Sequence, residues 1–75
     1  MTNFEKYFST PEKLAEISID NTEYYYKPPQ YRIQVNWSSP GRVWKCLFQS
    51  GRSTVYETVQ AEFIAWLNKE VPDGD

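Results

Sequence analysis

The stretch "YRIQVNW" at residues 31–37 constrains the fold more than any other part of the chain. Its apolar side chains stand at the odd positions and alternate with Arg32, Gln34 and Asn36. A period of two is typical of a β-strand with one apolar and one polar face. Antiparallel sheets that are solvated on one side have this pattern. We therefore expect an antiparallel sheet with one buried face.

A second strand is predicted at "RVWKCLFQ", residues 42–49, after the turn signal "SSPG". In a regular strand, Trp44, Cys46 and Phe48 share one face, and the opposite face is largely apolar as well. We therefore expect this strand to be central in the sheet. Cys46, between two aromatic side chains on one face, is expected to be buried and chemically inert.

A helix is predicted over residues 10–17. Ser9 or Thr10 can cap it, Ser9 with Glu12 fits a capping box, and Pro11 fits the first turn because its missing N–H has no helical partner there. The sequence "DNT" at residues 20–22 favours a turn that ends this segment.

A second helix is predicted from Val59, where apolar side chains begin to recur at intervals of three and four residues. Thr58 is its expected cap. Residues 54–58 are compatible with either a third strand or the start of this helix. Pro72 marks the end, and residues 72–75 are expected to be a frayed polar tail.

"EYYYK" at residues 23–27 suggests an additional edge strand, which the following proline pair would end. Period two then places either Tyr25 or the pair Tyr24 and Tyr26 in the core. At least one tyrosine of the run must face outward. An exposed tyrosine here is a candidate contact for a protein partner.

These segments predict a small α+β domain: an antiparallel β-meander of about three strands with an N-terminal and a C-terminal helix packed on one face. The chain has 75 residues, enough for a single domain over residues 1–75. Thirteen aromatic residues, each of which can bury about 150–250 Å², favour folding by packing alone.

Catalytic and metal-binding interpretations find little support in the composition. With one cysteine and no histidine, the chain can form no internal disulfide and cannot assemble the usual zinc ligand sets or a histidine-based triad. Glu57 and Glu62 are ordinary carboxylates of a solvated helix. We expect a protein that is not an enzyme and that uses no cofactor and no metal.

Positive charge is concentrated in the middle of the chain. Residues 27–52 carry five cationic side chains and no acidic one, whereas both ends are acidic and the net charge is −2. The polar strand face, its turns and one tyrosine supply the candidate partner-binding residues: Arg32, Gln34, Asn36, Arg42, Lys45, Arg52 and Tyr25. This surface suits an anionic partner, either an acidic protein surface or nucleic acid. The alternative is a solvated face without a partner.

Nucleic acid ranks below protein as the expected partner. Single strands are held by rings for base stacking beside cations for phosphate. In residues 31–37 the rings share a face with Ile33 and Val35, while Arg32 points the other way. The final helix offers a further surface, because Ile64 widens its apolar stripe enough for a possible homodimer.

The phrases "TNFEKYF", "TPEKLAE" and "FIAWLNKEV" resemble small uncharacterised proteins encoded by phages and prophages of Gram-positive bacteria. The resemblance covers about a third of the chain, at its two ends. Relatives of this kind often carry cysteine pairs in the middle. Since this chain has only Cys46, no metal role carries over. The resemblance implies an accessory protein that acts by contact with a host or phage protein and identifies no catalytic residue.

The N-terminus lacks a secretory pattern, and no run of eighteen apolar residues occurs. We expect a cytoplasmic protein that does not engage a membrane. The leading functional hypothesis is a protein-interaction module, and nucleic-acid binding through residues 27–52 is the alternative.

Overall fold

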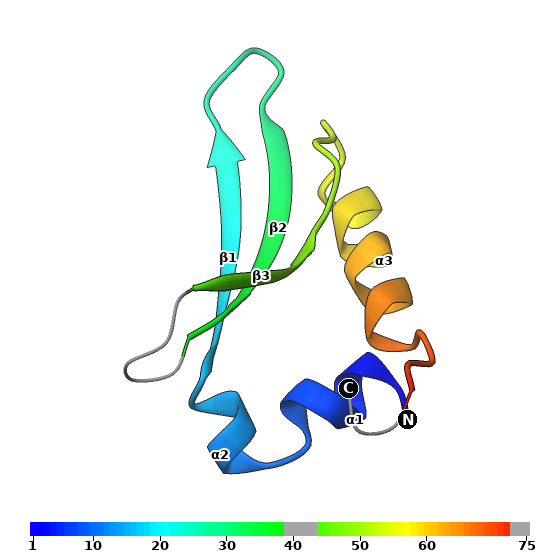
Figure 1. The fold of residues 1–75 in the computed structure, drawn as a ribbon. Helices are drawn as coiled ribbons and strands as arrows, with labels where there is room; N and C mark the ends of the chain where they lie inside the picture. Colours follow the sequence, from blue (N-terminus) through cyan, green and yellow to red (C-terminus); the bar gives the residue numbers. More distant parts are fainter. Residues whose placement is uncertain (39–43, 73–75) are drawn as a thin grey trace.

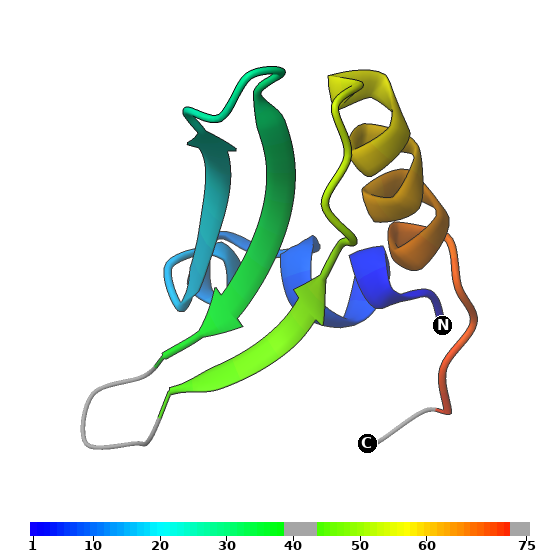
Figure 2. The same ribbon diagram turned by 90° about the horizontal axis from the view of Figure 1, so that it is seen from above.

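The computed structural model describes residues 1–38 and 44–72. They form α1 (Asn3–Phe8), α2 (Pro11–Leu14), β1 (Ile17–Tyr24), β2 (Gln30–Trp37), β3 (Lys45–Gln49) and α3 (Tyr56–Leu67). In Figures 1 and 2, α3 runs beside a curved sheet, and α1 and α2 lie beyond one end of it. The expected α+β fold is confirmed: the three strands form one antiparallel meander, with helices before and after it.

The strand order is β1-β2-β3, so β2 is central and pairs with a strand on each side. The prediction that the second strand of the pattern is central was therefore wrong. The missing neighbour is β1, which pairs with β2 from Ile17 opposite Trp37 to Tyr24 opposite Gln30. The turn expected at residues 20–22 lies inside β1. Tertiary pairing with β2 overrides the turn preference of these polar residues.

A β-bulge changes which side chains of β3 face the core. Val35 pairs with Phe48, but the next residue of β2, Asn36, pairs with Cys46, so Leu47 is the extra residue. The bulge reverses the alternation, because a shift of one residue moves the following side chains to the opposite face. Phe48 faces the core. Cys46 is exposed, so the prediction of a buried cysteine was wrong.

The N-terminal helical segment is divided into two short helices. Thr10 caps α2 through a bond to the Lys13 N–H, and Pro11 occupies the first turn, as predicted. The helix ends at Leu14 rather than at residue 17. The capping box is found in α1 instead, where Thr2 and Glu5 exchange both bonds.

Helix α3 begins at Tyr56, three residues earlier than predicted. Its N-cap is Val55, which makes no side-chain capping bond, so the expected cap at Thr58 was wrong. Residues 56–58 belong to the helix. The end at Leu67, followed by the Asn68 C-cap, agrees with the sequence pattern. Residues 73–75 of the expected tail lie outside the described residues.

The core lies between α3 and the inner face of β2 and β3. Ile33, Val35 and Val59 are fully buried. Aromatic rings extend this core toward α1. Phe48 packs on both Phe63 and Trp66, with ring centroids 5.8 and 5.2 Å apart, and Phe8 meets the Trp66 ring edge to face. Aromatic packing therefore joins the sheet, α3 and α1, as the composition predicts.

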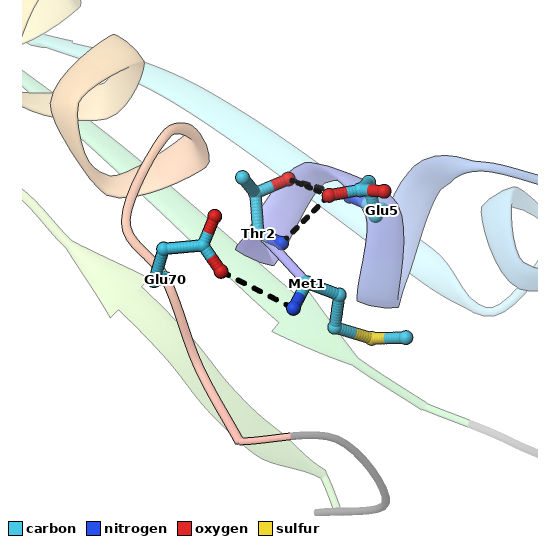
Figure 3. A network of polar contacts seen from close by, with 4 residues as sticks. All are labelled: Met1, Thr2, Glu5 and Glu70. Carbon is cyan, nitrogen blue, oxygen red and sulfur yellow. Dashed lines mark hydrogen bonds and ion pairs between the residues drawn. The ribbon is translucent and has the colours of Figure 1, made fainter.

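The two ends of the described chain are joined by polar contacts. The Met1 amino group forms an ion pair with Glu70 at 3.2 Å, and Thr2 bonds with Glu5 beside it (Figure 3). The buried Asn3 donates from Nδ2 to the Trp66 carbonyl at 2.8 Å. That carbonyl belongs to the last turn of α3, where helical acceptors are left without intrahelical donors. Asn3 thus fixes α1 against α3.

Candidate partner-binding site

Two arginines surround one tyrosine ring on the polar face of the sheet. The Cζ atom of Arg32 lies 5.5 Å from the Tyr24 ring centroid, and that of Arg52 lies 4.5 Å from the same centroid. Both distances are in the range of cation–π contacts. We call these three residues the Tyr24 cluster. Arg32 is on β2, Tyr24 ends β1, and Arg52 lies in the segment after β3.

Backbone pairing explains why two like charges lie together. After β3 the chain continues along β2, and Tyr31 and Ser53 exchange both backbone hydrogen bonds, at 2.7 and 3.2 Å. In an antiparallel pair this places the preceding residue, Arg52, opposite Arg32. Like charges directly opposite each other destabilise a sheet. The fold therefore keeps an electrostatically unfavourable pair.

In the described part of the chain, no acidic side chain forms an ion pair with these two arginines. The Nε atom of Arg32 is buried and has no hydrogen-bond partner. A buried donor without an acceptor costs free energy, and so does the repulsion between the two guanidinium groups. The cation–π contacts with the Tyr24 ring offset only part of these two costs.

Exposed rings continue the site at the β1–β2 hairpin. Tyr25 is 91% exposed and Tyr26 is 67% exposed, and Lys27, which follows, is exposed as well. The prediction that one register of the tyrosine run lies in the core was wrong, because the strand ends at Tyr24, and that residue shares the polar face with Arg32. Tyr25, whose exposure the sequence pattern left open, faces solvent. The sequence-based expectation that rings and cations lie on opposite faces does not hold at this end of the sheet.

The other candidate residues lie apart from the Tyr24 cluster. Gln34 donates to Asn36 at 3.2 Å, and Asn36 contacts Asp20 at 3.5 Å. This polar group also carries an acidic side chain, so it offers no cationic surface. Lys45 pairs with Trp37 across the bulge, on the opposite face from Asn36. Arg42 lies outside the described residues.

Groups with catalytic or metal-binding chemistry are dispersed. Glu62 accepts a bond from the Gly51 N–H at 2.9 Å and so has a structural role. Among the residues with described positions, no three acidic or cysteine side chains gather in a group suited to a metal ion. Cys46 is contacted by Gln34 Nε2 at 3.8 Å. The Tyr24 cluster is therefore the site best suited to bind another molecule.

Sequence reasoning found the arginines but not their arrangement. The missing signal was the partner of β2: only when residues 17–24 are recognised as a strand does Tyr24 fall on the face of Arg32. The apolar–polar alternation of residues 17–24 is weak, because polar Asn21 and Glu23 occupy positions that a buried strand would fill with apolar residues.

Comparison of the chain with models of protein families, with curated proteins and with solved structures finds no match. The resemblance of the chain ends to phage and prophage proteins therefore stays a prediction. Across the part of the chain whose structure is described, none of the helices has the length and apolar character needed to span a bilayer.

Proposed function

We propose that this chain is a non-enzymatic interaction module that binds an acidic segment of a partner protein at the Tyr24 cluster. The observation that supports this most directly is the pair of guanidinium groups, Arg32 and Arg52, which lie near one ring and form no ion pair with the acidic side chains of residues 1–38 and 44–72. A carboxylate of the partner would bridge the two cations. Arginine binds carboxylates with two parallel hydrogen bonds and anchors protein interfaces more often than lysine does.

Exposed tyrosines favour a protein partner as well. Tyr25 and Tyr26, which follow Tyr24 in the chain, present large exposed amphipathic rings, and both tyrosine and arginine are enriched at interface hot spots. Following the resemblance of the chain ends, we place the partner among host or phage proteins of the cytosol. Nothing in this proposal requires a catalytic group.

Single-stranded nucleic acid is the second candidate, and the same two exposed rings favour it. Tyr25 and Tyr26 offer exposed stacking surfaces in the same hairpin as Lys27, directly after the Tyr24 that the two arginines contact. The sequence pattern alone argued against such a platform. The net charge of −2 and the acidic chain ends repel an acidic peptide as well as phosphate, so the two candidates are separated by binding measurements rather than by net charge.

Fluorescence anisotropy with two labelled probes, an oligoglutamate peptide and an oligothymidine strand, tests the proposal. We expect the peptide to bind more tightly, and the Arg32→Ala/Arg52→Ala variant to weaken its binding by more than about tenfold, since charge-assisted hydrogen bonds contribute about 1.5–3 kcal/mol each. The matched control is Lys13→Ala/Lys69→Ala, which removes the same charge from exposed sites outside the cluster.

The two candidates differ in their salt dependence and probe preference. Tighter binding of the oligothymidine than of the peptide, with an affinity that falls steeply as the salt concentration rises, would favour nucleic acid over a protein as the partner. Equal peptide binding by the wild type and the double arginine variant, with the fold retained in circular dichroism, would refute the site.

A further inference from the structure

The outer edge of β1 has a regular row of backbone groups without partners. Ile33 directs both its N–H and its C=O toward Ser50, on the β3 side of β2. In an antiparallel ladder these directions alternate, so Arg32 and Gln34 bond to β1, to Thr22 and Asp20. The intervening residues of β1 direct their backbone groups away from the sheet. These outward residues are Ile17, Ile19, Asn21 and Glu23.

No backbone partner for these four residues occurs in the described part of the chain. Both ribbon views place β1 as the strand farthest from α3 (Figures 1 and 2). Accordingly Ile19, whose side chain is on the same face as Val35, is 44% exposed. The inner face of β1 is thus poorly covered within one copy of the chain.

The two edges of the sheet differ in their protection. Edge strand β3 is five residues long, begins with Lys45 and contains the bulge at Leu47, three features that discourage pairing with another strand. Edge strand β1 is eight residues long, pairs with β2 without a register shift and contains no lysine, proline or glycine. Charged side chains also discourage pairing, and β1 carries two, Asp20 on the polar face and Glu23 on the inner face. Its length and regularity still make it the better template for strand addition of the two edges.

We propose that two copies of this chain pair through their β1 edges, antiparallel about a two-fold axis at Asn21, and form one continuous six-stranded sheet. The axis keeps both inner faces on the same side, so paired residues have the same parity. Centred on Asn21, the register places Asp20 opposite Thr22 of the second copy and Ile19 opposite Glu23. The neighbouring register, centred on Asp20, would place two carboxylates directly opposite each other and is disfavoured.

A second copy fits this edge better than a foreign strand because the edge is complementary to itself in this register. Asn21, Ile19 and Glu23 all direct their N–H and C=O groups outward. In this register Asn21 therefore forms a fully hydrogen-bonded pair with Asn21 of the second copy, and Ile19 forms one with Glu23 of the second copy. Pairing would also cover Ile19. The proposal is independent of the Tyr24 cluster, which lies on the polar face.

Sedimentation equilibrium of the wild type and of Asn21→Pro tests the proposal. Proline at residue 21 removes an outward N–H and leaves the ladder to β2 intact, a position that edge strands tolerate. We expect a wild-type dimer whose dissociation constant rises by more than about tenfold in this variant, because two symmetric hydrogen bonds are lost. The control is Ile64→Lys, which changes an exposed residue of α3 and should leave the dimer intact.

Cross-linking gives a second readout that does not depend on proline being tolerated. In a Cys46→Ser background, Asn21→Cys should form covalent dimers with a short thiol cross-linker more rapidly than Ile19→Cys, since only residue 21 lies on the axis. A wild type that is monomeric at all concentrations would overturn the proposal. So would a dimer that is lost in Ile64→Lys but unaffected by Asn21→Pro, or faster cross-linking at residue 19.

Discussion

The Cζ atom of Arg52 lies 4.5 Å from the centroid of the Tyr24 ring. The two residues come from opposite sides of β2, because Tyr24 ends β1 and Arg52 belongs to the segment that pairs with the other edge of β2. Arg32, on β2 itself, faces the same ring. The ring therefore has two cations and no anion beside it in the described structure. An arrangement of this kind gains free energy when an anion binds, because the ligand relieves the repulsion between the arginines.

Removing one of these arginines should change binding without lowering stability. For Arg52→Ala we expect a change of less than about 0.5 kcal/mol in the free energy of unfolding, since the lost cation–π contact is offset by relief of repulsion. Urea denaturation measures this. A loss above about 2 kcal/mol would mean that the cluster is a structural element rather than a binding site.

Ser50→Ala should destabilise the fold by about 1–3 kcal/mol. The Ser50 Oγ atom accepts a bond from the buried Ile33 N–H at 2.9 Å and so replaces a strand carbonyl at the end of β3. Alanine would leave that N–H without an acceptor. Thermal unfolding of this variant is compared with Ser53→Ala, where the hydroxyl bonds the exposed Val55 N–H and little change is expected. Equal effects of the two substitutions would contradict the assignment.

Asn3→Asp should lower the free energy of unfolding by at least about 2 kcal/mol. Asn3 is only 4% exposed, and its Nδ2 donates to the Trp66 carbonyl. The change replaces this donor with a carboxylate oxygen that would face the carbonyl oxygen. Chemical denaturation measures the loss. Gln60→Glu makes the same amide-to-acid change on the exposed surface of α3 and should have little effect. If Asn3→Asp is equally mild, Asn3 does not hold α1 to α3.

Cys46 should react with a thiol reagent in the folded protein. The bulge at Leu47 turns its side chain to the exposed face, so the rate of modification is expected within about tenfold of that of the unfolded chain. Absorbance after addition of a chromogenic disulfide measures the rate. If Cys46 reacts only after unfolding, the bulge is contradicted, and Cys46 lies on the same buried face as Phe48, as in a regular strand.

The sequence predicted those parts of the fold in which local pattern and tertiary structure agree. The alternation of residues 31–37 identified β2, and the apolar spacing after Val59 identified α3. Strand β1 could not be predicted, because polar Asp20 and Asn21 stand in a strand that is stabilised by pairing with β2 rather than by burial. The bulge at Leu47 has no local sequence signal, so the face of the sheet on which Cys46 lies was predicted wrongly.

For the candidate site, the sequence identified Arg32, Arg52 and Tyr25 as candidate contacts and placed the two arginines outside the core, but it left open which tyrosines of residues 24–26 are exposed. It did not bring Tyr24 to the arginines, because that proximity depends on the register between β1 and β2 and on the Tyr31–Ser53 bridge. Both are long-range pairings. Local patterns indicate which face a residue occupies, but not which distant residue lies beside it.

The most direct test of the account is an NMR titration of ¹⁵N-labelled protein with an oligoglutamate peptide, observing the arginine Nε–H signals together with the backbone amides. We expect the largest shifts at the Nε–H groups of Arg32 and Arg52 and at the amides of residues 24–27. Shifts centred on the lysines of the helices, or no saturable shifts at the Tyr24 cluster, would contradict the claim that this cluster binds an acidic partner.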